Sequence, residues 1–217
     1  MDQDQVLEVL QKVGAFRTGH FVFTSGRHSD TYVNKDALYP YTHDTSLLCK
    51  EMGMRFKDAG VEAVIGPAVA AAILAQWTAS HLTTMLGREV FATYADKDGQ
   101  GGFVIKRGYD KVITDKKILI VEDLTTTGGS IKKVVDATRA AGAEVIGVCV
   151  LCNRGGVTAK VVGAPKLESL VKVELDSWDA KDCDLCKRKI PVSTNMGHGK
   201  EFLEKKSARG ASARGGK

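Results

Sequence analysis

Apolar residues along this chain alternate between unbroken runs and spaced patterns. Four runs of strand length are almost continuously apolar: residues 61–67, 89–95, 117–123 and 143–154. Two stretches between them carry small or apolar residues at helical spacing, residues 68–86 and 129–141. Strands that are buried on both faces have unbroken apolar sequences of this kind. The pattern therefore predicts an α/β fold in which helices cover both faces of a parallel sheet.

The N-terminal part of the chain follows a different pattern. Helical spacing predicts one helix over residues 4–14 and another over residues 42–59. Residues 20–39 alternate around a Ser-Gly-Arg turn, which predicts a small hairpin, or hood, outside the main sheet.

After about residue 165 the pattern weakens and predicts a single short strand within residues 167–175. We expect one domain over residues 1–199, with the hood within residues 1–40 and a C-terminal extension over residues 165–199.

Charge is concentrated at one end of the chain. The 217 residues have a net charge of +5, and residues 200–217 hold six Lys or Arg against two Glu. These last residues are poor in apolar side chains after Leu203, so they predict a disordered basic tail with a solubilising role. Residues 1–199 are nearly neutral, which argues against a folded nucleic-acid-binding face.

Cysteine content and the N-terminal residues suggest a compartment. Five cysteines are an odd number, which does not suit a secreted disulfide framework. Residues 1–10 are acidic, whereas a secretory signal begins with a basic segment that an apolar segment follows. The sequence also has no run of about 18 apolar residues that could span a membrane. We therefore expect a cytoplasmic protein without a membrane segment.

The most informative stretch is "ILIVEDLTTTGGSIKKVV", residues 118–135. Glu122 and Asp123 lie at the carboxyl end of a predicted strand, where parallel sheets bind ligands, and "TTTGG" precedes a predicted helix. Glycines and free N–H groups at a helix start suit a phosphate, while carboxylates repel phosphate and accept hydrogen bonds from sugar hydroxyls. The combination indicates a ribose 5-phosphate site. A plain strand–loop–helix connection with an N-cap threonine would not need two acids and five Thr or Gly residues, and the Walker lysine is missing.

The same stretch resembles the phosphoribosyl-pyrophosphate signature of the type I phosphoribosyltransferases. Three further segments are similar to the orotate branch of that family, in the family's order: "GHFVFTSGRHSDTYVNK", "VIGPAVAAAILA" and "CVLCNRG". The resemblance spans residues 14–156. It implies the family's parallel sheet with flanking helices and a small N-terminal hood.

The resemblance also implies an activity. Members of this branch transfer ribose 5-phosphate from phosphoribosyl pyrophosphate to orotate, giving orotidine 5′-monophosphate and pyrophosphate in pyrimidine biosynthesis. The reaction depends on Mg²⁺, bound mainly through phosphoribosyl pyrophosphate rather than by protein side chains. The family works as a homodimer. A related transferase for a purine or another base, and a non-catalytic regulator that senses phosphoribosyl pyrophosphate and binds nucleic acid, are the alternatives.

Site residues follow from the matched motifs. The residues implied to bind phosphoribosyl pyrophosphate are Glu122, Asp123, Leu124, Thr125, Thr126, Thr127, Gly128, Gly129, Ser130, Ala70 and Ala71. Those implied to contact orotate are Thr126, Arg154, Ser25, Gly26 and Arg27, next to Thr24. Many relatives have lysine where this chain has Thr24, and Gly-Gly or Lys-Gly in place of Ala70 and Ala71.

The glycine-rich insert at residues 96–116 has two interpretations. By spacing alone it is equally an exposed hairpin or a mobile loop. The resemblance favours the family's catalytic loop, which closes over a neighbouring subunit. Lys97, Lys106 and Arg107 would then bring positive charge to the pyrophosphate, with Glu122 and Asp123 as the other catalytic residues.

Two cysteine pairs share the spacing of a zinc knuckle. Cys149 and Cys152 lie in a predicted strand, where residues three apart point to opposite faces, so core packing is expected. Cys183 and Cys186 could form half of a zinc site, which would need two more ligands, such as His198 or residues of a second chain. His20, His28 and His43 show no ligand spacing, so surface or hydrogen-bonded roles are expected of them.

Overall fold

The computed structural model describes residues 1–23 and 25–212, and side chains as far as residue 205. The described chain forms two compact units. The larger unit contains Met1–Val13 and Lys35–Glu174, and the smaller unit contains Gly14–Asn34 and the chain from Leu175 onward. The segment expected to form an N-terminal hood, residues 1–40, is thus divided between the two units.

The larger unit is built on a six-stranded sheet with the order β5-β4-β3-β6-β7-β8. Its strands are β3 (Ala63–Pro67), β4 (Phe91–Lys97), β5 (Phe103–Val104), β6 (Lys117–Thr125), β7 (Glu144–Asn153) and β8 (Leu167–Lys172). Every neighbouring pair is parallel except β4 and β5. The predicted parallel sheet is confirmed, with a short antiparallel edge strand added.

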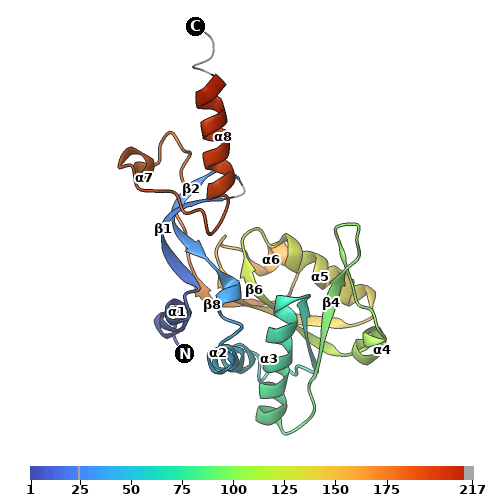
Figure 1. Cartoon of the computed structure of the whole chain (residues 1–217). Coiled ribbons are helices and arrows are strands. Elements are labelled where there is room, and N and C mark those ends of the chain that lie inside the picture. Colours follow the sequence, from blue (N-terminus) through green and yellow to red (C-terminus); the bar gives the residue numbers. More distant parts are fainter. Residues whose placement is uncertain (24, 213–217) are drawn as a thin grey trace. The chain divides into compact units, whose positions relative to one another are not determined.

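Helices cover both faces of this sheet (Figure 1). The longer ones are α1 (Gln3–Lys12), α2 (Thr42–Met54), α3 (Ala70–Leu86) and α5 (Gly129–Ala140). Three short ones were not predicted: η1 (Lys35–Ala37), α4 (Tyr109–Ile113) and α6 (Ala159–Val162). Each of these has five residues or fewer, too few to show a helical period.

Alternate residues of β6 explain why helices are needed on both sides. Ile118 and Ile120 are fully buried in one cluster with Val134 and Val135 of α5. On β7, a Cβ at Gly147 would lie 2.3 Å from the ring of Phe56, which follows α2. Successive strand residues point to opposite faces, so both faces bury apolar side chains and the strand sequences are unbroken.

The smaller unit contains the antiparallel hairpin of β1 (Phe16–Val22) and β2 (His28–Val33), as the alternating pattern predicted. Two C-terminal helices belong to the same unit, α7 (Asp184–Lys187) and α8 (Gly199–Ser212). His28 and Trp178 exchange backbone hydrogen bonds of 2.8 Å in both directions. The hairpin is therefore bonded to the C-terminal segment of the chain.

The predicted disordered tail is wrong for residues 200–212, which are helical as part of α8. The ring of Phe202 meets the ring of His28 edge-on, with centroids 4.7 Å apart, and α8 contacts β1. One aromatic contact and a sequence rich in Ala, Lys, Glu and Arg favour helix where low overall hydrophobicity suggested disorder. Residues 213–217 of the predicted tail lie outside the described residues. No helix within residues 1–23 and 25–212 is both long enough and apolar enough to cross a membrane.

Candidate active site

The strand order reverses at one point of the large sheet. β3 is the first of the parallel strands in the chain, β4 lies on one side of it, and β6 and β7 follow on the other. The loops that leave β3 and β6 therefore diverge to opposite sides, which opens a crevice at their carboxyl ends. Both stretches that carry the predicted phosphoribosyl-pyrophosphate residues begin there.

The loop after β3 folds closely back on the strand. A Cβ at Gly66 would lie 2.1 Å from the carbonyl oxygen of Ala71, so only glycine allows this approach. Val69 is 82% exposed, and the Ala68–Val69 peptide bond is cis. Ala70 and Ala71 line a cavity of about 310 Å³ together with residues that follow β6.

The loop after β6 forms a second, smaller cavity of about 200 Å³. Its lining consists of Glu122, Leu124, Thr125, Thr126, Thr127, Gly128, Gly129, Ser130 and Ile131. Gly128 has φ of 78°, and an added Cβ would lie 2.8 Å from Val157. Helix α5 starts at Gly129, so unpaired N–H groups and threonine hydroxyls surround a space suited to a phosphate. Gly155 is required for the same loop, because its Cβ would overlap the carbonyl oxygen of Thr126.

Asp123 is the centre of a buried polar cluster in the larger cavity. Its Oδ2 accepts hydrogen bonds from Lys35 Nζ at 3.0 Å and from the Tyr39 hydroxyl at 2.7 Å. Glu122 Oε1 accepts the backbone N–H of Asp123 at 3.0 Å. Lys35, Glu122, Asp123, Leu124 and Ser130 all line the same cavity. We call Glu122, Asp123, Lys35 and Tyr39 the carboxylate cluster.

Burial and mutual repulsion shape the protonation of this cluster. Burial, then the neighbouring Asp123 charge, raises the pKa of Glu122 from 4.5 to about 8. Burial and the same carboxylate raise the pKa of the Tyr39 phenol, which keeps its proton. Burial alone would lower the pKa of Lys35, but Asp123 holds it above its ordinary value. The cluster therefore has one carboxylate, Asp123, that is bonded to Lys35 and Tyr39, and a second, Glu122, that takes up a proton near neutral pH.

Lys35 and Tyr39 were not predicted from the sequence. They lie 88 and 84 residues before Asp123, and η1 with the turn after it brings them to the end of β6. No local spacing marks such a pairing. The only available signal was a charged residue at the end of the segment that resembles the orotate branch, "DTYVNK".

The insert at residues 96–116 is a tight hairpin at its start. β4 and β5 pair through Asp96 with Val104 and Lys97 with Phe103. The backbone N–H groups of Gln100 and Gly102 donate to Asp98 and hold its pKa below the ordinary value. This geometry is compatible with both interpretations of the insert.

The three cations of the insert that were predicted to be catalytic differ in their surroundings. Lys97 lines the larger cavity with Glu122 and Asp123. Arg107 lies 3.6 Å from Asp96 instead, and Lys106 is exposed and contributes to the lowered pKa of Asp98. The structure therefore brings one of the three predicted catalytic cations to the carboxylates.

The residues predicted to contact orotate lie in both units. Arg154 follows β7, and its backbone N–H donates to the carbonyl of Thr125 at 2.8 Å, which joins it to the phosphate loop. In the smaller unit, the Arg27 side chain donates to Ser177 Oγ at 2.9 Å and to the carbonyl of Ser177, and its Nη1 lies 3.3 Å from Asp179. The base-covering role of Ser25, Gly26 and Arg27 stays a prediction, and Thr24 lies outside the described residues.

Comparison with known proteins decides the family. Residues 53–179 match the phosphoribosyl transferase domain family. A curated orotate phosphoribosyltransferase of Caldanaerobacter subterraneus is 33% identical over 88% of this chain and 96% of the relative. That of Thermotoga maritima is 36% identical over 86% of this chain and 95% of the relative. The chain belongs to the orotate phosphoribosyltransferase family.

The crystal structure of the orotate phosphoribosyltransferase from Aeropyrum pernix agrees with this assignment. It is 25% identical, covers 77% of this chain and 93% of its own, and superimposes with a TM-score of 0.61. The predicted family and fold are confirmed. The central sheet is mixed rather than wholly parallel, because of β5.

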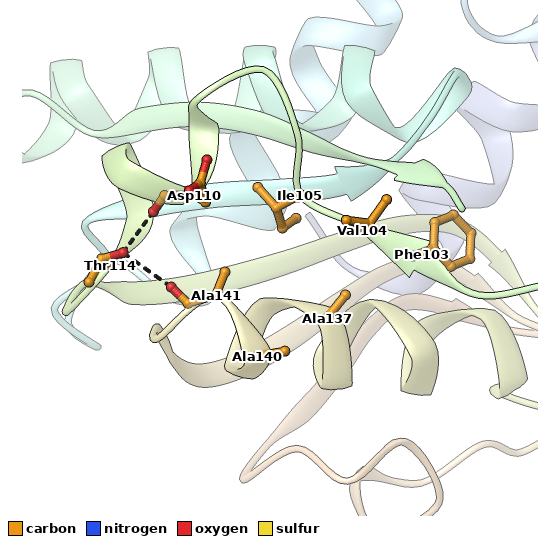
Figure 2. Close-up of a pocket in the computed structure, with 8 residues that line it drawn as sticks. All are labelled: Phe103, Val104, Ile105, Asp110, Thr114, Ala137, Ala140 and Ala141. Atoms are coloured by element: carbon orange, nitrogen blue, oxygen red, sulfur yellow. Dashed lines mark hydrogen bonds between the residues drawn. The ribbon is translucent and has the colours of Figure 1, made fainter. Parts of the chain in front are cut away.

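A further cavity of about 400 Å³ lies away from the orotate phosphoribosyltransferase signature, between β5, α4 and α5 (Figure 2). Its lining is mostly apolar, from Phe103 and Ile105 to Ala137 and Ala141. The Thr114 hydroxyl is already bonded to the carbonyls of Asp110 and Ala141, as the dashed lines in Figure 2 mark. This hollow has none of the phosphate-binding features of the other two.

Proposed function

We propose that this protein transfers ribose 5-phosphate from phosphoribosyl pyrophosphate to orotate, forming orotidine 5′-monophosphate and releasing pyrophosphate. The observation that carries the proposal is the pairing of a phosphate loop, Thr125 to Ser130, with Glu122 and Asp123 at the sheet's switch point. Identities of 33–36% to curated orotate phosphoribosyltransferases over most of the chain support the choice of base.

The chemistry assigns different charges to different parts of the site. Breaking the anomeric bond leaves positive charge on the ribose and negative charge on pyrophosphate. The Asp123 carboxylate accepts hydrogen bonds from the ribose hydroxyls, while the N–H groups of the phosphate loop bind the 5′-phosphate. Lys35 and Tyr39 both donate to Oδ2 of Asp123, so the ribose hydroxyls bond to its Oδ1 or replace one of these two donors at Oδ2.

The leaving group requires positive charge near Ala70 and Ala71. These residues line the cavity but carry no charge. Lys35 and Lys97 line the same cavity, and Lys35 is bonded to Asp123, so we assign Lys97 to the leaving group. Lys106 and Arg107 reach the pyrophosphate only after the insert changes conformation. Mg²⁺ bound through phosphoribosyl pyrophosphate would supply further stabilisation of the negative charge on the leaving group.

Base recognition falls to Arg154 and Thr126 in the larger unit. A guanidinium donates in a forked arrangement that suits the carboxylate and carbonyl groups of orotate. The backbone hydrogen bond from Arg154 N–H to the carbonyl of Thr125 supports this role, because it holds Arg154 next to the phosphate loop.

The active form is a homodimer in this proposal, with the insert of one subunit acting on the site of the other. Mixing two inactive variants, Asp123→Asn and Lys106→Ala, should then restore about a quarter of wild-type activity through hybrid dimers. No recovery on mixing would contradict action across subunits.

A panel of bases tests the function directly. The purified protein is mixed with Mg²⁺, phosphoribosyl pyrophosphate and orotate, uracil, adenine, guanine or hypoxanthine, and pyrophosphate release is measured. Preferential consumption of orotate is expected. Turnover of a purine alone would replace the substrate, and binding of phosphoribosyl pyrophosphate without turnover of any base would favour a sensor.

A further inference from the structure

Four potential metal ligands converge in the smaller unit, outside the site described above. His20 lies in β1 and His28 is the first residue of β2. Cys183 is the residue just before α7, and Cys186 lies within α7. One ligand atom from each lies within 4.8 Å of all the others. His20, His28 and Cys183 are 2%, 0% and 0% exposed, and Cys186 is partly buried. We call these four residues the thiol–imidazole cluster.

The distances match the edges of a tetrahedral metal site. Zn–N bonds of about 2.0–2.1 Å and Zn–S bonds of about 2.3 Å place N and S atoms about 3.6 Å apart in a tetrahedron. His20 Nε2 lies 3.6 Å from Cys183 Sγ and 3.7 Å from Cys186 Sγ, and His28 Nδ1 lies 3.5 Å from Cys186 Sγ. The two ring nitrogens, 2.7 Å apart, are closer than the about 3.4 Å of such a site, and every other pair of ligand atoms lies within 4.8 Å. Moving the two imidazole rings apart by a fraction of an ångström would bring this N–N distance to the value of a tetrahedral site.

Local backbone geometry aims the cysteines at one point. Cys183 precedes α7 and Cys186 lies within it, so the two thiols share one side of a single helical turn. Lys187 N–H donates to the carbonyl of Cys183, and Lys189 N–H donates to that of Cys186. Lys189 then adopts φ of 57°, which turns the chain back towards β1.

The second ring nitrogen of His20 is held by that returning chain. His20 Nδ1–H donates to the carbonyl oxygen of Ile190 at 2.8 Å, which leaves the Nε2 lone pair to act as the metal ligand. The β1–β2 register shifts between Thr18 and Phe21, next to His20, and such irregularities re-aim strand side chains. The ring of Phe202 packs edge-on against the His28 ring.

The structure assigns a function to this convergence: we propose that His20, His28, Cys183 and Cys186 bind one Zn²⁺ ion per chain as a structural site. Two thiolates and two neutral imidazoles balance the charge of a divalent ion, so the filled site is neutral in its buried position. Soft thiolates with imidazoles in a tetrahedron favour zinc over Mg²⁺ or Ca²⁺, which take oxygen ligands. Four protein ligands leave no open position for substrate, so the ion links segments rather than reacting.

The sequence interpretation found half of this site. Cys183 and Cys186 were considered as zinc ligands, but with His198 or a second chain as partners. His198 Nδ1 lies 3.7 Å from Glu201 instead, and the other two ligands are the hairpin histidines. The ion would join the two strands of the hairpin to the C-terminal segment, and it does not depend on the proposed transferase activity.

Metal analysis of the full-length protein tests the site. Protein purified without added metal or chelator should contain close to one zinc per chain by inductively coupled plasma mass spectrometry. Replacing zinc by Co²⁺ should give the intense visible bands and thiolate charge-transfer absorption of a tetrahedral S₂N₂ site. Cys183→Ser and His20→Asn should each lose most of the bound zinc.

Matched variants separate this proposal from its rivals. Cys152→Ala removes a buried thiol of the same spacing in the larger unit, and His198→Ala removes the histidine first considered as a ligand. Both should keep a full zinc content. The proposal is overturned by a chain that stays zinc-free after incubation with ZnCl₂, by a Cys183–Cys186 disulfide in the purified protein, by iron in place of zinc, or by zinc loss in His198→Ala.

Discussion

The two buried polar clusters of this protein have opposite designs. The carboxylate cluster lines a cavity of about 310 Å³, and its central acid, Asp123, is held by two replaceable partners, Lys35 and Tyr39. The thiol–imidazole cluster points its ligand atoms at one another, within 4.8 Å. The carboxylate cluster is open, with room for a ligand that replaces its internal hydrogen bonds. The thiol–imidazole cluster is closed, with room for a single ion. Convergence of side chains therefore marks a site, and the space beside them decides what the site can bind.

The largest expected effect comes from the open cluster. Asp123→Asn keeps the size of the side chain and can still accept from Tyr39, but it removes the negative charge beside the ribose. We expect kcat/KM with orotate to fall by about 10²–10³-fold, because this charge opposes the positive charge of the transition state. Initial rates and calorimetric binding of phosphoribosyl pyrophosphate measure it. Zinc content should not change, and a rate within a few-fold of wild type would exclude the proposed role of Asp123.

Metal removal is the matching change in the closed cluster. After zinc is stripped with a chelator and Mg²⁺ is restored, backbone amides of β1, β2 and residues 183–190 should exchange hydrogen about 10²-fold faster. Amides of β6 and β7 in the larger unit should be unaffected. Hydrogen exchange with mass spectrometry resolves the two regions in one sample. Equal acceleration in both units would mean that the cluster is not a local constraint.

Glu122→Gln tests the protonation of the open cluster. Because the folded pKa of Glu122 is raised to about 8 from 4.5, the folded state keeps a proton that the unfolded state has released. The free energy of unfolding of the wild type therefore falls as pH rises from about 4.5 to 8, and the glutamine variant lacks this loss. We expect the variant to gain about 4 kcal/mol relative to wild type between these pH values, because one pKa unit corresponds to about 1.4 kcal/mol. Urea unfolding at pH 5 and pH 8 measures this difference. If the free energy of unfolding changes equally with pH in the wild type and the variant, the pKa of Glu122 is not raised.

The sequence predicts those residues of the two clusters that lie close together along the chain, and it does not predict those that lie far apart. The strands β3, β6 and β7 and the helices α3 and α5 were predicted, because burial on both faces leaves unbroken apolar runs. Glu122, Asp123 and the phosphate loop were predicted because one contiguous stretch carries them all. Lys35 and Tyr39 were not, since only the folded chain brings them to Asp123.

The two cysteine pairs have the same spacing in the sequence but different surroundings in the structure. Cys149 and Cys152 are buried in β7, as predicted, and burial raises the pKa of the Cys152 thiol to about 12. Cys183 and Cys186 have identical spacing, but a helical turn places both thiols on one side. Secondary structure therefore decides what the spacing means, and α7 is too short to be predicted from its sequence. The histidines that complete the cluster come from strands more than 150 residues earlier.

Tyr39→Phe makes the smallest change to the carboxylate cluster. The Tyr39 hydroxyl donates a 2.7 Å hydrogen bond to Asp123, which also keeps Lys35 as a partner. A hydrogen bond to a carboxylate is worth more than a neutral one, but the remaining lysine and the open cavity limit the loss. We expect the free energy of unfolding at neutral pH to fall by about 1 kcal/mol. Tyr41→Phe is the matched control, because Tyr41 is 51% exposed and its loss should change nothing measurable. If both variants unfold at the same urea concentration as the wild type, Tyr39 does not stabilise Asp123. A loss of several kcal/mol for Tyr39→Phe alone would mean that this cluster is as closed as the thiol–imidazole one.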